Sequence, residues 1–258
     1  MCDCEEIDER DEDVIVSEIL RFDEFNAFYS TERKPTKTEV PIKWIIKPSC
    51  KGFAAQGIDA NGTDYIELRH NPKTREDAFL VAHEITHLIR KKIDKQYLNF
   101  SKVNDAILEK YTIDDMGEFA SRLGSMFDDP IIDHFLKDKY GFNPEHHYTR
   151  VVIPDSIKNL NRGDARDELH RLNQAMFYAQ YALQWDAIDN VGALRKWHNF
   201  KRLYQRQRPI AKRIGEDLYS MAKETGLDTL DKQKQLFNKI ADKYSLNGIK
   251  LKDILYIE

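Results

Sequence analysis

Cysteine is scarce in this 258-residue chain, which has only Cys2, Cys4 and Cys50. Three thiols are too few for a disulfide scaffold, and their odd number favours free thiols. Cys2 and Cys4 form a Cys-x-Cys pair that could hold a metal, but two thiolates are only half of the ligands of a structural zinc site. The cysteines therefore favour neither a disulfide framework nor a zinc finger.

A long apolar run and a strong net charge are also missing. No stretch approaches the roughly 20 apolar residues that span a membrane, and the acidic start Met-Cys-Asp-Cys-Glu-Glu lacks the basic and then apolar residues of a signal peptide. The formal net charge is -4, so no overall positive charge attracts nucleic acid or an anionic membrane. We expect a cytoplasmic protein without a membrane partner, for which nucleic acid is not the first partner to consider.

The order of apolar patterns and turn signals predicts an α+β fold. Residues 1–13 carry eight acidic side chains and one arginine, and we expect them to be a disordered tail. A helix is predicted next, and then a small sheet with a hairpin at Asn61-Gly62. These elements are the helix 14–29 and the strands 40–46, 53–58 and 65–68.

Helices dominate the rest of the chain. Thr74 is a good N-cap for a helix over 75–91, with Asp77 three residues later as in a capping box. A second helix is predicted from Thr112 or Asp114 to the Asp129-Pro130 break, and a third from there to Gly141. From about residue 164 the pattern is helical to the end, with breaks at 190–192, 209, 226 and 247–248. The expected domains are 14–150 and a helical region over 151–258, which could pack on the first as one unit.

The chemistry of the chain is concentrated in His83-Glu84-Ile-Thr-His87. On a helix, side chains four residues apart project from one face, so both imidazoles can bind one Zn²⁺. Glu84 lies beside the metal and can take a proton from a zinc-bound water. The sequence thus predicts His83 and His87 as metal ligands and Glu84 as the catalytic base.

The apolar residues on both sides of this motif support its interpretation as a metal site. Leu80, Val81 and Ala82 precede it, and Leu88 and Ile89 follow it, so the turn is expected to be buried. Buried imidazole and carboxylate groups are costly unless something satisfies them, and a metal ion does so. The alternative is a pair of core histidines bonded to backbone groups, with Glu84 at a surface edge.

A catalytic zinc needs a third protein ligand and an open position. Glu118, 31 residues after His87 on the predicted second helix, is the first candidate. Asp133 or His134 could reach the metal instead. Asp128 and Asp129 are interpreted as helix caps. The cluster His146-His147-Tyr148 is read as a surface loop, or as a donor to an oxyanion.

These motifs resemble those of the Glu-ligated zincins, and in particular the ImmA/IrrE-like intracellular metallopeptidases. The resemblance rests on Tyr65-Ile-Glu-Leu, on Phe79-Leu-Val-Ala-His-Glu and on Glu118-Phe-Ala-Ser121-Arg-Leu-Gly, closing at Pro130, and it covers about residues 40–130. It implies a zincin-like fold in which two histidines and Glu118 hold zinc. It also implies that a peptide substrate adds to the edge of the sheet, for which 65–68 is the candidate strand. Ser121 and Thr86 depart from the family pattern, which expects Asn or Asp and Gly there.

The segment 195–213 contains eight basic residues and no acidic ones. Trp197, Phe200 and Tyr204 recur in it at helical spacing, which predicts an amphipathic helix with a basic face. That face could bind an acidic partner, nucleic acid, or the acidic N-terminal run of this chain.

The sequence as a whole predicts a zinc-dependent peptidase that uses Glu84 as general base. Two alternatives stay open. The chain could be a regulatory or binding protein that keeps a zincin scaffold and cuts one partner or none. It could also bind nucleic acid through 195–213.

Overall fold

The computed structural model describes residues 8–50, 53–98, 100–160, 163–186, 188 and 190–257. It divides into two compact units, one of residues 1–95 and 135–144, the other of residues 96–134 and 145–258. These limits differ from the expected boundary at residue 150, because residues 96–134 and 145–150 belong with the second unit. Helices predominate beside a small mixed sheet, which confirms the α+β class. The Cys2–Cys4 pair lies outside the described residues.

The first unit contains a four-stranded sheet with the order β1-β2-β4-β3. Its strands are β1 (Asp8–Arg10), β2 (Lys43–Ile46), β3 (Ala54–Ile58) and β4 (Asp64–Leu68). β2 pairs parallel with β4, and the other two pairings are antiparallel. The three predicted strands are confirmed, although β2 begins three residues later than expected.

The predicted hairpin joins β3 to β4. The Asp59 side chain accepts hydrogen bonds from the backbone N–H groups of Asn61 and Thr63, both at 2.9 Å, and Gly62 supplies the left-handed φ of +80° that closes the turn. β4 lies between β2 and β3, so the expectation that 65–68 is an edge strand is wrong. The edge on this side is β3.

The acidic start of the chain is ordered where the structure describes it. Residues 8–10 form β1, which pairs with β2, and α1 (Glu12–Val16) follows. The expectation of a disordered tail over 1–13 is therefore wrong for residues 8–13. Ile15 and Val16 are fully buried, and their apolar burial fixes the segment that precedes them.

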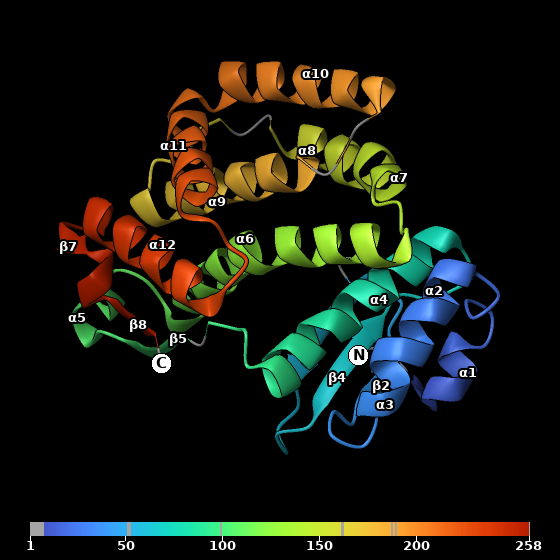
Figure 1. The fold of residues 1–258 in the computed structure, drawn as a ribbon. Helices are drawn as coiled ribbons and strands as arrows, with labels where there is room; N and C mark the ends of the chain where they lie inside the picture. Colours follow the sequence, from blue (N-terminus) through green and yellow to red (C-terminus); the bar gives the residue numbers. More distant parts are fainter. Residues whose placement is uncertain are drawn as a thin grey trace, which may run out of the picture. The chain divides into compact units, whose positions relative to one another are not determined.

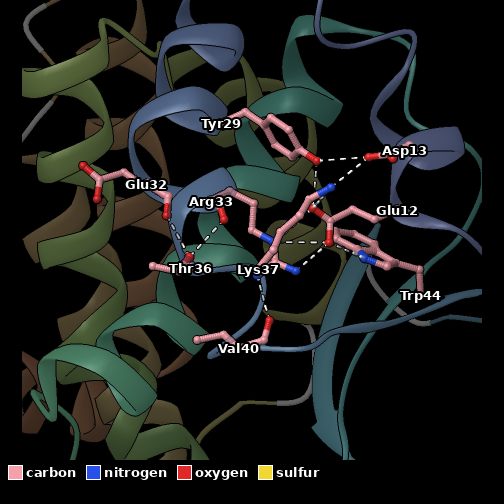
Figure 2. A network of polar contacts seen from close by, with 9 residues as sticks. All are labelled: Glu12, Asp13, Tyr29, Glu32, Arg33, Thr36, Lys37, Val40 and Trp44. Atoms are coloured by element: carbon pink, nitrogen blue, oxygen red, sulfur yellow. Dashed lines mark hydrogen bonds and ion pairs between the residues drawn. The ribbon is translucent and has the colours of Figure 1, made fainter.

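A polar network also ties α1 to the first unit (Figure 2). The Glu12 carboxylate accepts hydrogen bonds from Nε of Arg33 at 3.0 Å and from Oη of Tyr29 at 2.9 Å. It also accepts one from Nε1 of Trp44 at 3.2 Å. Arg33 in turn donates from Nη1 to the Val40 carbonyl at 2.7 Å. The Arg33 side chain is only 2% exposed and that of Glu12 11%, so this is a buried ion pair with hydrogen bonds on both partners.

The remaining helices of the first unit lie in two stretches. The predicted helix 14–29 is interrupted after α1 and resumes as α2 (Asp23–Phe28), followed by the π-helical turn Tyr29–Arg33 and by α3 (Lys34–Thr36). The helix predicted over 75–91 is α4 (Arg75–Ile89), which continues as a π-helical turn over Arg90–Asp94. α4 packs against β3 and α2 (Figure 1).

One long helix, α6 (Ile113–Tyr140), replaces the two helices that were predicted over this range. Its start is as expected, because Thr112 and Asp115 form a reciprocal cap. The break at Pro130 is wrong. A proline inside a helix costs about 3 kcal/mol, but Met126 and Phe127 just before it are buried in a core, which offsets that cost. Gly141, with a φ of +77°, ends the helix as predicted.

The second unit is mainly helical. It contains α5 (Asp105–Leu108), α7 (Glu145–His147), a π-helical turn (Tyr148–Val152), α8 (Ile153–Asn159), α9 (Glu168–Trp185), α10 (Val191–Gln207), α11 (Pro209–Thr225) and α12 (Leu230–Lys243). The predicted breaks after α9, near Pro209 and at Gly226 are confirmed. The chain is not helical to its end, because β6 (Ser245–Leu246) and β7 (Ile249–Lys250) form a hairpin at Asn247-Gly248, and β8 (Leu255–Ile257) pairs with β5 (Phe100–Val103).

Among the described residues of the second unit, buried apolar side chains form two hydrophobic cores. One is formed where α6, α9, α11 and α12 meet, with Phe127, Met176, Leu218 and Phe237 in its interior. The other is aromatic and joins α8, α9 and α10. Within the described part of the chain, none of the helices has both the length and the apolar composition that a membrane crossing requires.

Replacing Glu12 should destabilise the fold. We expect Glu12→Ala to lower the free energy of unfolding by about 3–5 kcal/mol, because it leaves the Arg33 guanidinium buried and without its carboxylate. Urea unfolding measures the loss. Asp13→Ala is the control, since the Asp13 side chain is 85% exposed, and it should leave the midpoint almost unchanged.

The same pair should respond to pH. Burial raises the pKa of Glu12, but the hydrogen bonds and charge of Arg33 outweigh that effect and hold the pKa below its usual 4.5. The contribution of the pair is therefore complete above about pH 4.5 and is lost as the pH falls through the lower native pKa. The stability gap between the wild type and Glu12→Ala should narrow in acid. A gap that stays constant from neutral pH to pH 3 (about the lower end of the carboxyl range) would contradict this assignment.

Candidate metal centre

The residues just before the motif determine where helix α4 begins. Thr74 Oγ1 accepts a hydrogen bond from the backbone N–H of Asp77 at 3.1 Å, and the Asp77 carboxylate accepts one from the backbone N–H of Thr74 at 2.9 Å. This is the predicted capping box, and it satisfies groups that a helix start otherwise leaves unpaired. The helix therefore begins at Arg75, and the motif lies in its last two turns.

The motif turn is buried, as its neighbours predicted. Val81, Ala82 and Ile85 are fully inaccessible to solvent, and His83 and His87 are 9% and 7% exposed. Thr86, which departs from the family pattern, donates from Oγ1 to the Ala82 carbonyl at 2.7 Å. Its hydroxyl is thus satisfied within the helix.

His83 and His87 present the same ring nitrogen to one another. Their Nε2 atoms are 3.1 Å apart, and the ring centroids are 4.8 Å apart at an angle of 74°. Two ligands of a tetrahedral zinc, each about 2.05 Å from the ion, are separated by about 3.3 Å. The pair thus has the spacing of two ligands of one ion. A hydrogen bond from one neutral imidazole to the other gives a similar distance.

Glu84 is half-buried, one position along the helix from His83. Successive residues of a helix differ by about 100° in direction, so its carboxylate does not project along the line of the two imidazoles. That direction suits a base that acts beside a metal, as the motif predicts.

The candidate third ligands lie on α6 and differ in their surroundings. Glu118 is exposed, and its role as a ligand stays a prediction. Asp133 is fully buried and accepts hydrogen bonds from Nε2 of Gln184 at 2.8 Å and from Oη of Tyr148. His134 is half-buried. Asp133 is therefore already part of a hydrogen-bonded network in the second unit.

Asp128 and Asp129 are not helix caps, because α6 continues through them. The Asp129 carboxylate accepts a hydrogen bond from Nε2 of Gln180 at 2.6 Å. The pairs Asp129–Gln180 and Asp133–Gln184 repeat at a four-residue spacing on α6 and α9, so they form two parallel rungs between these helices. These pairs could not be predicted from local sequence patterns, because the two residues of each pair are 51 positions apart.

The cluster at 146–148 is not a surface loop. His146 and His147 belong to α7, and Tyr148 is buried at 3% exposure. Burial, together with the nearby carboxylate of Asp133, raises the pKa of Tyr148 well above its usual 10. Its hydroxyl thus stays protonated and donates to Asp133, which makes a structural role the better interpretation.

The chain matches no family model, no curated protein and no solved structure. The resemblance to the ImmA/IrrE-like metallopeptidases therefore rests on the motif residues alone. What the structure adds is local: a capped and buried helix that presents two imidazole nitrogens to one point.

Removing the Tyr148 hydroxyl tests whether Asp133 is structural. We expect Tyr148→Phe to lower the free energy of unfolding by about 1–3 kcal/mol, since a buried carboxylate loses a donor, and to leave the metal content unchanged. The control is Tyr219→Phe, whose hydroxyl donates to Asp186 at an exposed position; it should unfold like the wild type. Loss of bound metal in Tyr148→Phe at unchanged stability would argue for Asp133 as a ligand.

Proposed function

We propose that this protein is a zinc-dependent peptidase in which His83 and His87 bind the metal and Glu84 is the general base. One observation carries the proposal: the two Nε2 atoms lie 3.1 Å apart on a buried helix face. A metal ion would coordinate both nitrogens and so offset the free-energy cost of burying the two imidazoles. The motif supplies the base that hydrolysis needs at the adjacent position.

For the third ligand we propose Glu118, as the resemblance to the Glu-ligated zincins implies. A carboxylate beside two histidines is a common ligand set of catalytic zinc sites. The Glu118 side chain is exposed on α6. Asp133 is the weaker candidate, because its carboxylate already accepts hydrogen bonds from Gln184 and Tyr148.

Zinc, when bound, would act as a Lewis acid that polarises a peptide carbonyl and lowers the pKa of a water molecule. Glu84 would accept the proton of that water and pass it to the leaving amine. β3 is an edge strand that packs against α4, and its outer side could pair with an extended peptide by strand addition. These roles together describe hydrolysis of a peptide bond.

Metal content tests the ligand set. We expect purified wild-type protein to hold about one zinc per chain, and His83→Ala to hold almost none. Glu118→Gln should weaken zinc binding strongly, because it removes an anionic ligand. Asp114→Asn, which changes an exposed carboxylate on the first turn of the same helix, is the matched control and should bind zinc as the wild type does. Unchanged zinc binding in Glu118→Gln would contradict Glu118 as the ligand.

Peptide cleavage tests the reaction separately. Glu84→Gln should retain zinc and lose about 100-fold or more of the cleavage rate on a peptide library, because general-base catalysis contributes that much. Glu76→Gln, on the first turn of the same helix, should behave as the wild type. A wild-type protein that binds zinc but cleaves nothing would instead support a binding protein on this scaffold.

A further inference from the structure

Helix α10 of the second unit carries an unbalanced positive charge. Between residues 191 and 213 the chain has eight arginines and lysines and no carboxylate. Arg195, Lys196, Arg202 and Arg206 are all exposed on α10, and we call them the cationic face. The described residues include no acidic partner for any of the four; Arg202 donates to Asn199 at 3.1 Å, and Lys196 to the Thr149 carbonyl at 3.5 Å.

The arginines of the cationic face form a stripe. Arg202 and Arg206 lie seven and eleven residues after Arg195, so at 3.6 residues per turn the three lie within about 40° of one another and span about 16 Å. Asn199 and Gln205 are exposed among them and add neutral donors. The stripe is therefore a row of hydrogen-bond donors in which the three arginines carry the positive charges.

The opposite side of α10 is entirely occupied by the aromatic core. Trp197 stacks on Trp185 with ring centroids 5.6 Å apart, and Phe200 and Tyr204 are fully buried. Figure 1 shows α10 as an outer helix of the second unit, with α8 and α9 on one side of it. The predicted amphipathic helix is thus confirmed, and its free side is mainly polar, with Val191 exposed at its start.

We propose that the cationic face binds the phosphate backbone of a duplex nucleic acid. A duplex offers a dense and regular row of phosphates, about one charge per 1.7 Å of axis. Arginine, lysine, asparagine and glutamine are the side chains that contact such phosphates. Single strands are bound largely by stacking on aromatic rings, and every aromatic ring of α10 is buried.

A protein or membrane partner fits this face less well. Protein interfaces centre on buried apolar or aromatic anchors; among the described residues, the large exposed apolar side chains nearest to the face are Val191 and Ile210, at its two ends. Helices that lie in a membrane surface insert an apolar face, and that of α10 is packed in the core. The cationic face is therefore best suited to binding phosphates through charge, without recognition of the bases.

Fluorescence anisotropy of the full-length protein with short random duplexes of DNA and RNA tests this proposal. We expect weak binding, with a dissociation constant of roughly 10⁻⁴–10⁻⁶ M at physiological salt, and a log–log salt slope of about -3 to -4. Replacing Arg195, Arg202 and Arg206 together by Gln should weaken binding at low salt by at least about 10-fold and reduce the slope by about 2.7. The three side chains are exposed and Gln is a good helix former, so the melting temperature should not change.

The control removes the same charge elsewhere. Lys223, Lys239 and Lys252 are exposed on α11, on α12 and in the turn after β7, and replacing them by Gln should leave duplex binding intact. The proposal would be overturned if both triple variants lost duplex affinity equally, or if the wild type did not bind a duplex at low salt. It would also be overturned if the wild type bound single strands more tightly than duplexes. So would binding to phosphatidylserine vesicles or to polyglutamate, lost in the arginine variant, without binding to either duplex.

Discussion

The proposed function depends on one constraint, which is that the two buried imidazoles of α4 need partners for their nitrogens. His83 and His87 lie in a helix whose other buried residues are mostly apolar, and removing polar rings from water is costly unless their nitrogens are satisfied. Each nitrogen faces the other at 3.1 Å. Either one ring donates to the other, or both bind an ion. A catalytic metal also needs a general base beside it, and the position of Glu84 next to His83 supports the proposed function.

Two other buried carboxylates of the chain are paired in a similar way. Glu12 and Arg33 form an ion pair in the first unit, and Asp133 accepts two hydrogen bonds in the second. Such networks stabilise a fold only when each member is satisfied. Asp129 and Asp133 accept hydrogen bonds from Gln180 and Gln184 at the same four-residue spacing. Asp133 also accepts one from the Tyr148 hydroxyl, and we assign it a structural role on the basis of these two bonds.

The features that were predictable from the sequence depend on residues close together in the chain. The cap of α4 joins residues three apart, the β3–β4 turn joins Asp59 to Thr63, and the imidazole pair needs only a four-residue spacing. The features that were missed depend on distant partners. β1 exists through its pairing with β2, where Glu9 lies opposite Ile45. The long α6 survives Pro130 because Met126 and Phe127 are buried in a core shared with α11 and α12, far along the chain.

X-ray absorption at the zinc edge tests the central claim most directly, since it reports the atoms around the metal without any substitution. For protein loaded with one equivalent of zinc, we predict a shell of nitrogen and oxygen at about 2.0–2.1 Å, with the multiple-scattering signature of two imidazoles. A sulfur shell at about 2.3 Å would place the metal on the cysteines instead. That result, or a spectrum without imidazole, would contradict His83 and His87 as ligands of one ion.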